Sequence, residues 1–191
     1  KNSMRTNGKQ LLAVAALLLI GIGNAVAQAP APPSKFKLMT SAFGEGTMIP
    51  TQYSCADTNA TSPELTWSNP PAGTAGFAMV MHDTDAAPAK GTMGVTHWIF
   101  WNISASATTV AGNVKPDTSR DGIVQGKNTR NVNGYQPPCP PPGATPHHYV
   151  FELYALDAKV DLPAGSPRAD LLKAMDGHVV GKATYVGLFG R

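Results

Sequence analysis

Apolar residues along the chain form short runs with strand character, most of them bounded by Gly, Pro, Asn or Asp. Six runs predict strands, at residues 36–39, 65–67, 76–81, 95–103, 148–156 and 179–188. Because alternate residues of a strand point to opposite faces, we expect His147, Tyr149 and Phe151 on one face of their strand. The same spacing predicts that His97, Ile99 and Trp101 share one face of theirs. The pattern therefore predicts a fold dominated by β-structure.

One segment late in the chain has the pattern of a short helix. Ser166 is a favoured N-cap residue, Pro167 suits the first helical position, and Gly177 can end the helix. The apolar positions that would face the core are Leu171, Leu172 and Met175.

The first residues have the three parts of a secretory signal in the required order. Basic residues come first, an apolar stretch follows at residues 11–22, and Ala25-Val26-Ala27 is typical of a cleavage site. We expect a signal peptide at residues 1–27, a flexible Ala- and Pro-rich leader at residues 28–35, and a single domain at residues 36–191, periplasmic or secreted. An N-terminal core helix is the alternative. No segment is long and apolar enough to predict a membrane span.

Removal of the signal changes the charge balance. The chain has 15 Lys and Arg against 12 Asp and Glu, and three of the basic residues but no acidic one precede Gln28, which leaves 12 against 12. A neutral mature domain gives no indication of nucleic-acid binding. Two cysteines, Cys55 and Cys139, remain after cleavage, and an oxidising compartment favours a disulfide between them. Two separate buried thiols are the alternative.

The long connection at residues 104–145 is rich in Gly, Pro, Asn and Thr. Loops of this length are uncommon unless they carry function, so we interpret it as part of a site. Residues 137–143 contain five prolines, which fix φ and remove backbone donors, and predict a stiff, irregular wall.

Polar residues gather where the predicted strands begin or end. Asp83 and Asp85 follow the run at residues 76–81, His97 lies within a strand, and His147 and Tyr149 enter the run at residues 148–156. Each residue alone also fits a structural role, because Asp is common in turns and a lone strand histidine is often simply hydrogen-bonded. His82, His148 and His178 are interpreted as structural.

The order and spacing of several motifs resemble the phosphatidylethanolamine-binding protein family, and within it the bacterial branch called Raf kinase inhibitor-like proteins. The motifs, in order, are Ser62-Pro63-Glu64-Leu65-Thr66-Trp67, Asp83-x-Asp85-x-x-Pro88, His97-Trp98, Gly134-Tyr135-x-x-Pro138-Cys139-Pro140-Pro141 and His147-x-Tyr149-x-Phe151. The tail from His178 to Arg191 also resembles that branch, so the similarity covers the chain from Phe36 onward.

The resemblance implies a mainly β fold with a large antiparallel sheet, a smaller sheet and few peripheral helices. It also implies a small pocket that takes phosphate-type or other anionic groups, such as a phospholipid head group. The implied ligand-binding residues are Asp83, Asp85, His97, Tyr135, Pro138, Pro140, His147 and Tyr149. The family's turn after its aspartates further implies a cis peptide bond at Ala87–Pro88.

Two departures from the family pattern bear on this pocket. The usual Asp-Pro-Asp-Ala-Pro is replaced by Asp83-Thr84-Asp85-Ala86-Ala87-Pro88, which leaves the position of Asp85 open. The usual Arg after the motif histidine is His148, which removes one fixed charge. For an anion beside two carboxylates, we expect His97 and His147 to donate hydrogen bonds, more strongly when protonated.

The leading functional hypothesis is an exported binding protein, not an enzyme, with no cofactor and no assigned catalytic or metal-binding residue. Its expected partner is a small anionic ligand or head group, with a protein partner and a homodimer left open. A metal-dependent hydrolase using the same His and Asp residues is one alternative, although the chain has neither H-E-x-x-H nor G-x-S-x-G. A protease or kinase inhibitor acting through the pocket rim is another.

Overall fold

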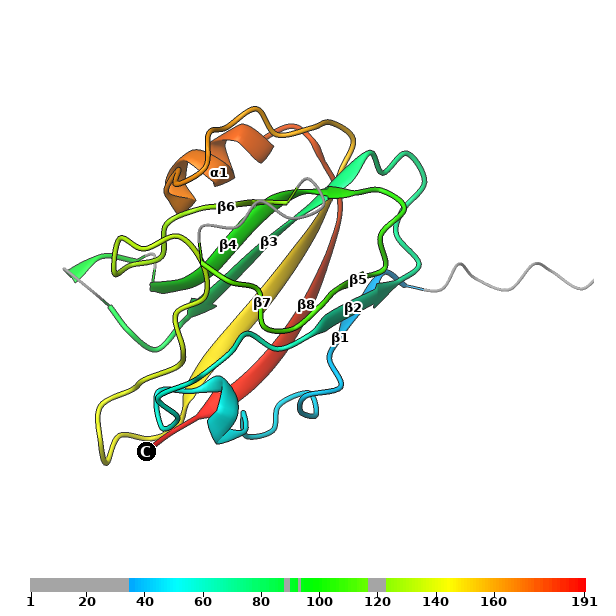
Figure 1. The fold of residues 1–191 in the computed structure, drawn as a ribbon. Helices are drawn as coiled ribbons and strands as arrows, with labels where there is room; N and C mark the ends of the chain where they lie inside the picture. Colours follow the sequence, from blue (N-terminus) through cyan, green and yellow to red (C-terminus); the bar gives the residue numbers. More distant parts are fainter. Residues whose placement is uncertain (1–34, 88–89, 93, 117–122) are drawn as a thin grey trace, which may run out of the picture. The chain divides into compact units, whose positions relative to one another are not determined.

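A computed structural model describes residues 35–87, 90–92, 94–116 and 123–191. In these ranges, two antiparallel sheets and one α-helix make up the fold (Figure 1). The five-stranded sheet has the order β6-β4-β3-β7-β8 and the three-stranded sheet the order β1-β2-β5. The strands of the larger sheet are β3 (Gly76–Asp83), β4 (Val95–Ser104), β6 (Val124–Gln125), β7 (His147–Leu156) and β8 (Val179–Phe189). The other elements are β1 (Lys37–Met39), β2 (Leu65–Ser68), β5 (Thr109–Val110), the 3-10 helix η1 (Thr51–Tyr53) and α1 (Arg168–Met175). The expected mainly β fold is confirmed.

The larger sheet is covered on both faces. On one face, Phe77, Met79 and Phe151 pack with Leu65 and Trp67 of the smaller sheet. On the other face, the core includes Ala78, Val80, Ile99 and Trp101 from the sheet and Leu171 and Met175 from α1. Figure 1 shows α1 on the side of the large sheet away from β1 and β2. Because both faces are buried, β3 lies in the interior over nearly its whole length. No helix in the described ranges is long and apolar enough to cross a bilayer.

The strand pattern predicted all six longer strands, and each lies within two residues of its expected bounds. The connection at residues 104–145 differs from the prediction, because it contains β5 and β6. The helix begins one residue later than expected. Pro167 occupies the N-cap position, and the Ser166 hydroxyl donates to the Pro163 carbonyl instead of capping the helix. Gly177 lies just past the helix end with φ +81°, the left-handed conformation that Gly adopts without strain.

A β-bulge in β4 gives the His97 side chain an orientation different from the predicted one. Met81 of β3 pairs with Trp98 and His82 pairs with Thr96, so His97 is an extra residue without a partner on β3. A bulge re-aims side chains relative to simple alternation. The His97 ring therefore contacts Tyr149, on the face toward the smaller sheet, whereas Ile99 and Trp101 pack on the face toward α1.

Cys55 and Cys139 form the expected disulfide. The bond joins the segment after η1 to the proline-rich wall, and the Cys55 amide also donates to the Pro138 carbonyl at 3.0 Å. The predicted signal peptide, nearly all of the predicted leader, and the predicted cis bond at Ala87–Pro88 lie outside the described residues.

Candidate functional site

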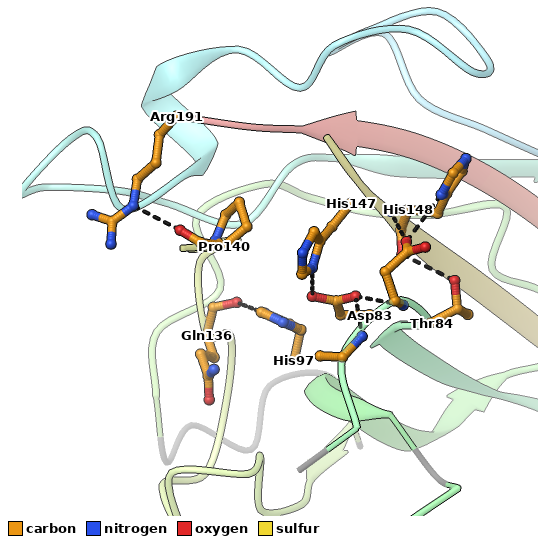
Figure 2. Close-up of polar contacts among 10 residues, drawn as sticks. Asp83, Thr84, His97, Gln136, Pro140, His147, His148 and Arg191 are labelled. Carbon is orange, nitrogen blue, oxygen red and sulfur yellow. Dashed lines mark hydrogen bonds and ion pairs between the residues drawn. The ribbon is translucent and has the colours of Figure 1, made fainter. Parts of the chain in front are cut away.

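Asp83 and His147 form the centre of the candidate site (Figure 2). Asp83 ends β3 and His147 begins β7, and these strands pair antiparallel with Asp83 opposite Tyr149. Nδ1 of His147 lies 2.7 Å from Oδ2 of Asp83. The other carboxylate oxygen, Oδ1, accepts from the amides of Asp85 at 2.9 Å and Ala86 at 3.2 Å. Asp83 is therefore held by donors on both oxygens and orients the His147 ring.

The turn that presents Asp83 depends on Gly94, directly before β4. Gly94 has φ +65°, which side-chain-bearing residues rarely adopt, and a Cβ atom there would overlap the Asp83 carbonyl oxygen. Glycine at this position lets the return strand approach the end of β3 closely, and so fixes where the carboxylate lies.

His97 is more deeply buried than His147, the other histidine at the centre of the site. Its Nδ1 lies 2.7 Å from the Gln136 carbonyl oxygen, and the Gln136 amide donates back to the His97 carbonyl at 2.7 Å. Burial lowers the pKa of His97 to about 4, against the opposing effects of the Gln136 hydrogen bond and the Asp83 charge. With this pKa the His97 ring is neutral near pH 7, so the stronger donation expected of a protonated His97 would require a lower pH.

Tyr149 lies beside these groups, opposite Asp83 in the pairing of β3 with β7. Its side chain is fully buried, and its ring meets the His97 ring edge-to-face with centroids 5.1 Å apart. Within the described part of the chain, the hydroxyl makes no hydrogen bond of standard geometry, although the Asp83 side chain and the Cys139 backbone lie near it. Burial raises the pKa of the phenol, and the nearby Asp83 charge raises it further, so the hydroxyl keeps its proton.

Asp85 lies farther out than Asp83 and pairs with His148. Its Oδ2 accepts from the His148 amide at 2.5 Å and from His148 Nδ1 at 2.9 Å, and 40% of its side chain is exposed. The hydrogen bond from the His148 amide lowers the pKa of Asp85. The structure thus places Asp85 at the rim, with His148 as a partner that the sequence did not indicate.

The proline-rich wall is tied to distant segments. The Pro138 carbonyl accepts from Cys55, and the Pro140 carbonyl accepts from Arg191 Nε at 2.7 Å, as Figure 2 shows for Arg191. Sequence reasoning missed both Gln136 and Arg191. Gln136 acts through its backbone, which leaves no residue-type signal to find.

Tyr135, which the family resemblance implies as a ligand-binding residue, packs against two neighbours and lines a cavity that no other residue of the implied set lines. Its hydroxyl donates to the Tyr53 carbonyl at 2.6 Å and its ring packs edge-to-face on Trp98. It lines a cavity of about 310 Å³ together with residues from two loops, Asn59, Ala60, Thr61, Ser62, Asn113, Val114, Lys115 and Pro116. No three His, Cys, Asp or Glu side chains in the described ranges are grouped to hold a metal ion.

Comparison with known protein families gives one match over most of the chain. A family model described as "Phosphatidylethanolamine-binding protein" matches residues 39–190. Among curated relatives, a UPF0098 protein of Methanothermobacter thermautotrophicus is 43% identical over 156 residues, which cover 81% of this chain and 98% of the relative. A protein of Mycobacterium tuberculosis with the name "Putative lipoprotein LppC" is 36% identical over 164 residues, which cover 85% of this chain and 77% of the relative.

Solved structures agree with this match. A phosphatidylethanolamine-binding protein homologue from Chlamydia trachomatis superposes with a TM-score of 0.72 at 34% identity, over 82% of this chain and 98% of that one. YbcL of Escherichia coli has a TM-score of 0.72 at 29% identity, over 83% of this chain and 99% of its own. The family resemblance inferred from the motifs is confirmed.

Proposed function

This chain belongs to the phosphatidylethanolamine-binding protein family, and on that basis we propose that it is an exported binding protein whose site holds a phosphate-type or other anionic group. The observation that carries the proposal is the buried Tyr149 hydroxyl, which makes no hydrogen bond of standard geometry in the described ranges and has only the Asp83 side chain and the Cys139 backbone near it. Buried polar atoms are rarely left unpaired, and an unpaired one calls for an explanation such as a functional role or a bound water or ion. An oxyanion beside Tyr149 would satisfy this donor.

The surrounding charges limit how an anion can bind. Asp83 is a buried carboxylate, and as an anion it would repel a second anion unless donors offset it. The Tyr149 hydroxyl is one donor, and Nε2 of His147 is a second whenever that ring is protonated. Oδ2 of Asp83 lies 2.7 Å from Nδ1 of His147, so a hydrogen on that nitrogen offsets part of the charge of the carboxylate.

We further propose that this site binds its ligand without transforming it. Two of the groups that acid–base chemistry would need are already held by protein partners, Asp83 by His147 and His97 by Gln136. Metal analysis of the purified protein tests the hydrolase alternative. A stoichiometric zinc ion that is lost in the His147→Ala variant would favour that alternative over binding alone.

Export to the periplasm or the medium, after cleavage near Ala27, is part of the proposal. Two observations support it: one relative is named as a lipoprotein, and the chain has a disulfide, which persists in oxidising compartments. Intact mass of the protein recovered from the exported fraction tests the cleavage position. An uncleaved chain confined to the cytoplasm would contradict it.

The binding proposal is tested by titration calorimetry with inorganic phosphate and phosphoethanolamine. Tyr149→Phe removes only the hydroxyl, and a hydrogen bond to a charged group contributes about 1.5–3 kcal/mol, so affinity should fall roughly 10- to 100-fold. Tyr154→Phe is the matched control, because the Tyr154 hydroxyl donates to Glu152, whose carboxylate also contacts His82 rather than the candidate site. Equal losses in both variants, or no binding by the unaltered protein, would overturn the proposal.

A further inference from the structure

We propose that the site selects oxyanions that carry a hydroxyl group, with Nε2 of His97 accepting the hydrogen bond that this hydroxyl donates. Inorganic phosphate and protonated phosphate monoesters would then bind, whereas sulfate and phosphate diesters would be disfavoured. The inference rests on the proposed function, because it concerns the chemistry of the same anion at the same site.

The hydrogen on His97 is positioned by its neighbour. Nδ1 lies 2.7 Å from the Gln136 carbonyl oxygen, and a carbonyl oxygen only accepts hydrogen bonds, so Nδ1 carries the hydrogen. A neutral imidazole has a single N–H, which leaves Nε2 with a lone pair and no proton. The mutual hydrogen bonds between His97 and Gln136 hold the ring in this orientation.

The charges near His97 do not convert it to a donor at neutral pH. Asp83 favours the protonated ring, whereas Arg130 and His82 oppose protonation, and burial opposes it most strongly. Only 2% of the residue is exposed to solvent. His97 therefore stays an acceptor at the Nε2 position under ordinary conditions.

The neighbouring groups leave the site rich in acceptors. His147 also places Nδ1 against an acceptor, Asp83 Oδ2, at 2.7 Å, so its Nε2 lacks a hydrogen whenever the ring is neutral. Asp83 is a carboxylate and can only accept. Tyr149 supplies the one hydroxyl donor among these four side chains. A ligand with acceptors alone would place a lone pair against Nε2 of His97, whereas a ligand with one hydroxyl can satisfy both His97 and Tyr149.

A comparison of phosphate and sulfate affinities distinguishes recognition of a ligand hydroxyl from simple charge attraction. At pH 7.5 both are mainly dianions of similar shape, but monohydrogen phosphate has a hydroxyl and sulfate has none. A site built around a ligand hydroxyl rejects an analogue that lacks it by a large factor. We expect phosphate to bind at least about 10-fold more tightly than sulfate.

Esters distinguish free phosphate from lipid-like sources. Methyl phosphate loses its hydroxyl hydrogen near pH 6, whereas dimethyl phosphate has no hydroxyl at any pH. The ratio of methyl phosphate to inorganic phosphate affinity should therefore fall as pH rises from 5.5 to 8, and dimethyl phosphate should bind as weakly as sulfate. His147 would contact both ligands, so a change in its protonation should alter both affinities alike. The ratio of the two affinities therefore does not report on His147.

The experiment is calorimetry with phosphate, sulfate, methyl phosphate and dimethyl phosphate on the unaltered protein, His97→Gln and His178→Gln. In His97→Gln an amide can present a donor, so the preference for phosphate over sulfate should fall toward unity, while His178→Gln should retain it because His178 is exposed and paired with Asp157. Equal phosphate and sulfate affinity in the unaltered protein would overturn this inference but leave the proposed function standing. Binding of neither anion would remove the proposed function itself.

A second measurement does not depend on any variant folding. Nitrogen-15 NMR of labelled histidine reports which ring nitrogen carries the hydrogen. At pH 7 we expect His97 to carry it on Nδ1, with Nε2 unprotonated. A His97 ring protonated on Nε2 would overturn the inference.

Discussion

Asp83 positions two other parts of the site, the turn after β3 and the His147 ring. Oδ1 accepts from the two amides of the turn after β3, and Oδ2 faces His147. A carboxylate in this arrangement fixes the imidazole orientation and tautomer, much as the outer partner of a metal-bound histidine does. Any substitution at Asp83 therefore changes both the turn and the direction of His147, whereas Tyr149→Phe changes a single donor.

The buried His97 should make the protein less stable in weak acid. Its pKa is about 4 in the folded state against 6.5 for a free side chain, so between these values the unfolded chain binds more protons than the folded one. The free energy of unfolding should fall as pH drops from 6.5 toward 4, by about 2–3 kcal/mol from this residue. Urea unfolding at pH 7.5 and 4.5 measures it.

His97→Gln cannot titrate, so its stability should change less across this window than that of the unaltered protein. His178→Gln is the control, since that ring is about half exposed. Identical pH dependence in the unaltered protein and His97→Gln would show that His97 takes up its proton in the folded state as readily as in the unfolded state.

At the residue scale, sequence indicated which residue types belong to the site better than how they are arranged. Asp83, His97, His147 and Tyr149 do come together. The orientation of His97 could not be predicted, because it depends on one extra residue in β4 that only the pairing with β3 reveals. Its neutral state depends on burial and on a backbone carbonyl, neither of which has a residue-type signal.

Strands β3 and β7 carry a second polar cluster at Glu152. The Glu152 carboxylate accepts from the Tyr154 hydroxyl at 2.9 Å and from Lys182 of β8, and His82 Nε2 lies 3.4 Å away. Burial alone would raise the pKa of Glu152, but the contacts with His82, Lys182 and Tyr154 outweigh it and lower the pKa to about 2. The cluster links three adjacent strands of the larger sheet.

Replacing this carboxylate should destabilise the sheet at neutral pH. Glu152→Gln loses the ion pair with Lys182 and weakens the other contacts, and we expect a loss of about 1–3 kcal/mol in the free energy of unfolding at pH 7. The contribution of a depressed carboxylate is present above its unfolded pKa of 4.5 and disappears as pH falls toward 2. The two proteins should therefore converge in stability over that range.

Denaturant unfolding from pH 7 to pH 2 measures this convergence, with Glu64→Gln as the control on an exposed residue. A constant difference between the unaltered protein and Glu152→Gln at all pH values would show that the loss comes from packing rather than from charge.

At the element scale, the length of each strand decided whether the sequence could predict it. The six longer strands have enough residues to show a hydrophobic pattern and turn residues at their ends. β5 and β6 have two residues each, too few for any periodicity, and pairing with β2 and β4 defines them. The helix start shifted by one residue because Ser166 bonds backward to Pro163 rather than forward into the helix.

At the scale of the whole molecule, the wall of the candidate site is held by segments far apart in sequence. The Arg191 side chain donates to Pro140, the Gly143 amide donates to the Arg191 carbonyl, and Tyr135 donates to Tyr53. The five prolines donate no backbone hydrogen bonds, so the wall is held by its carbonyl acceptors, by the Gly143 amide and by covalent attachment. Cys139, in the middle of the wall, provides that attachment.

The disulfide should therefore matter both for global stability and for the site. It joins residues 84 positions apart, and the loop-entropy treatment gives about 3–5 kcal/mol for closing a loop of this length. The double variant Cys55→Ala, Cys139→Ala should unfold at a Tm lower by roughly 6–20 °C. Phosphate affinity should also fall, because the wall beside Tyr149 loses its covalent link to the segment after η1.

Thermal unfolding with and without a thiol reductant, followed by phosphate calorimetry below the Tm, measures both effects. Reductant should lower the Tm of the unaltered protein toward that of the double variant and leave the double variant unchanged, which separates loss of the bond from other effects of the reductant. An unaltered protein that keeps its Tm after complete reduction, verified by thiol counting, would show that the hydrogen bonds of Arg191, Tyr135 and the Cys55 amide hold the wall without the covalent bond.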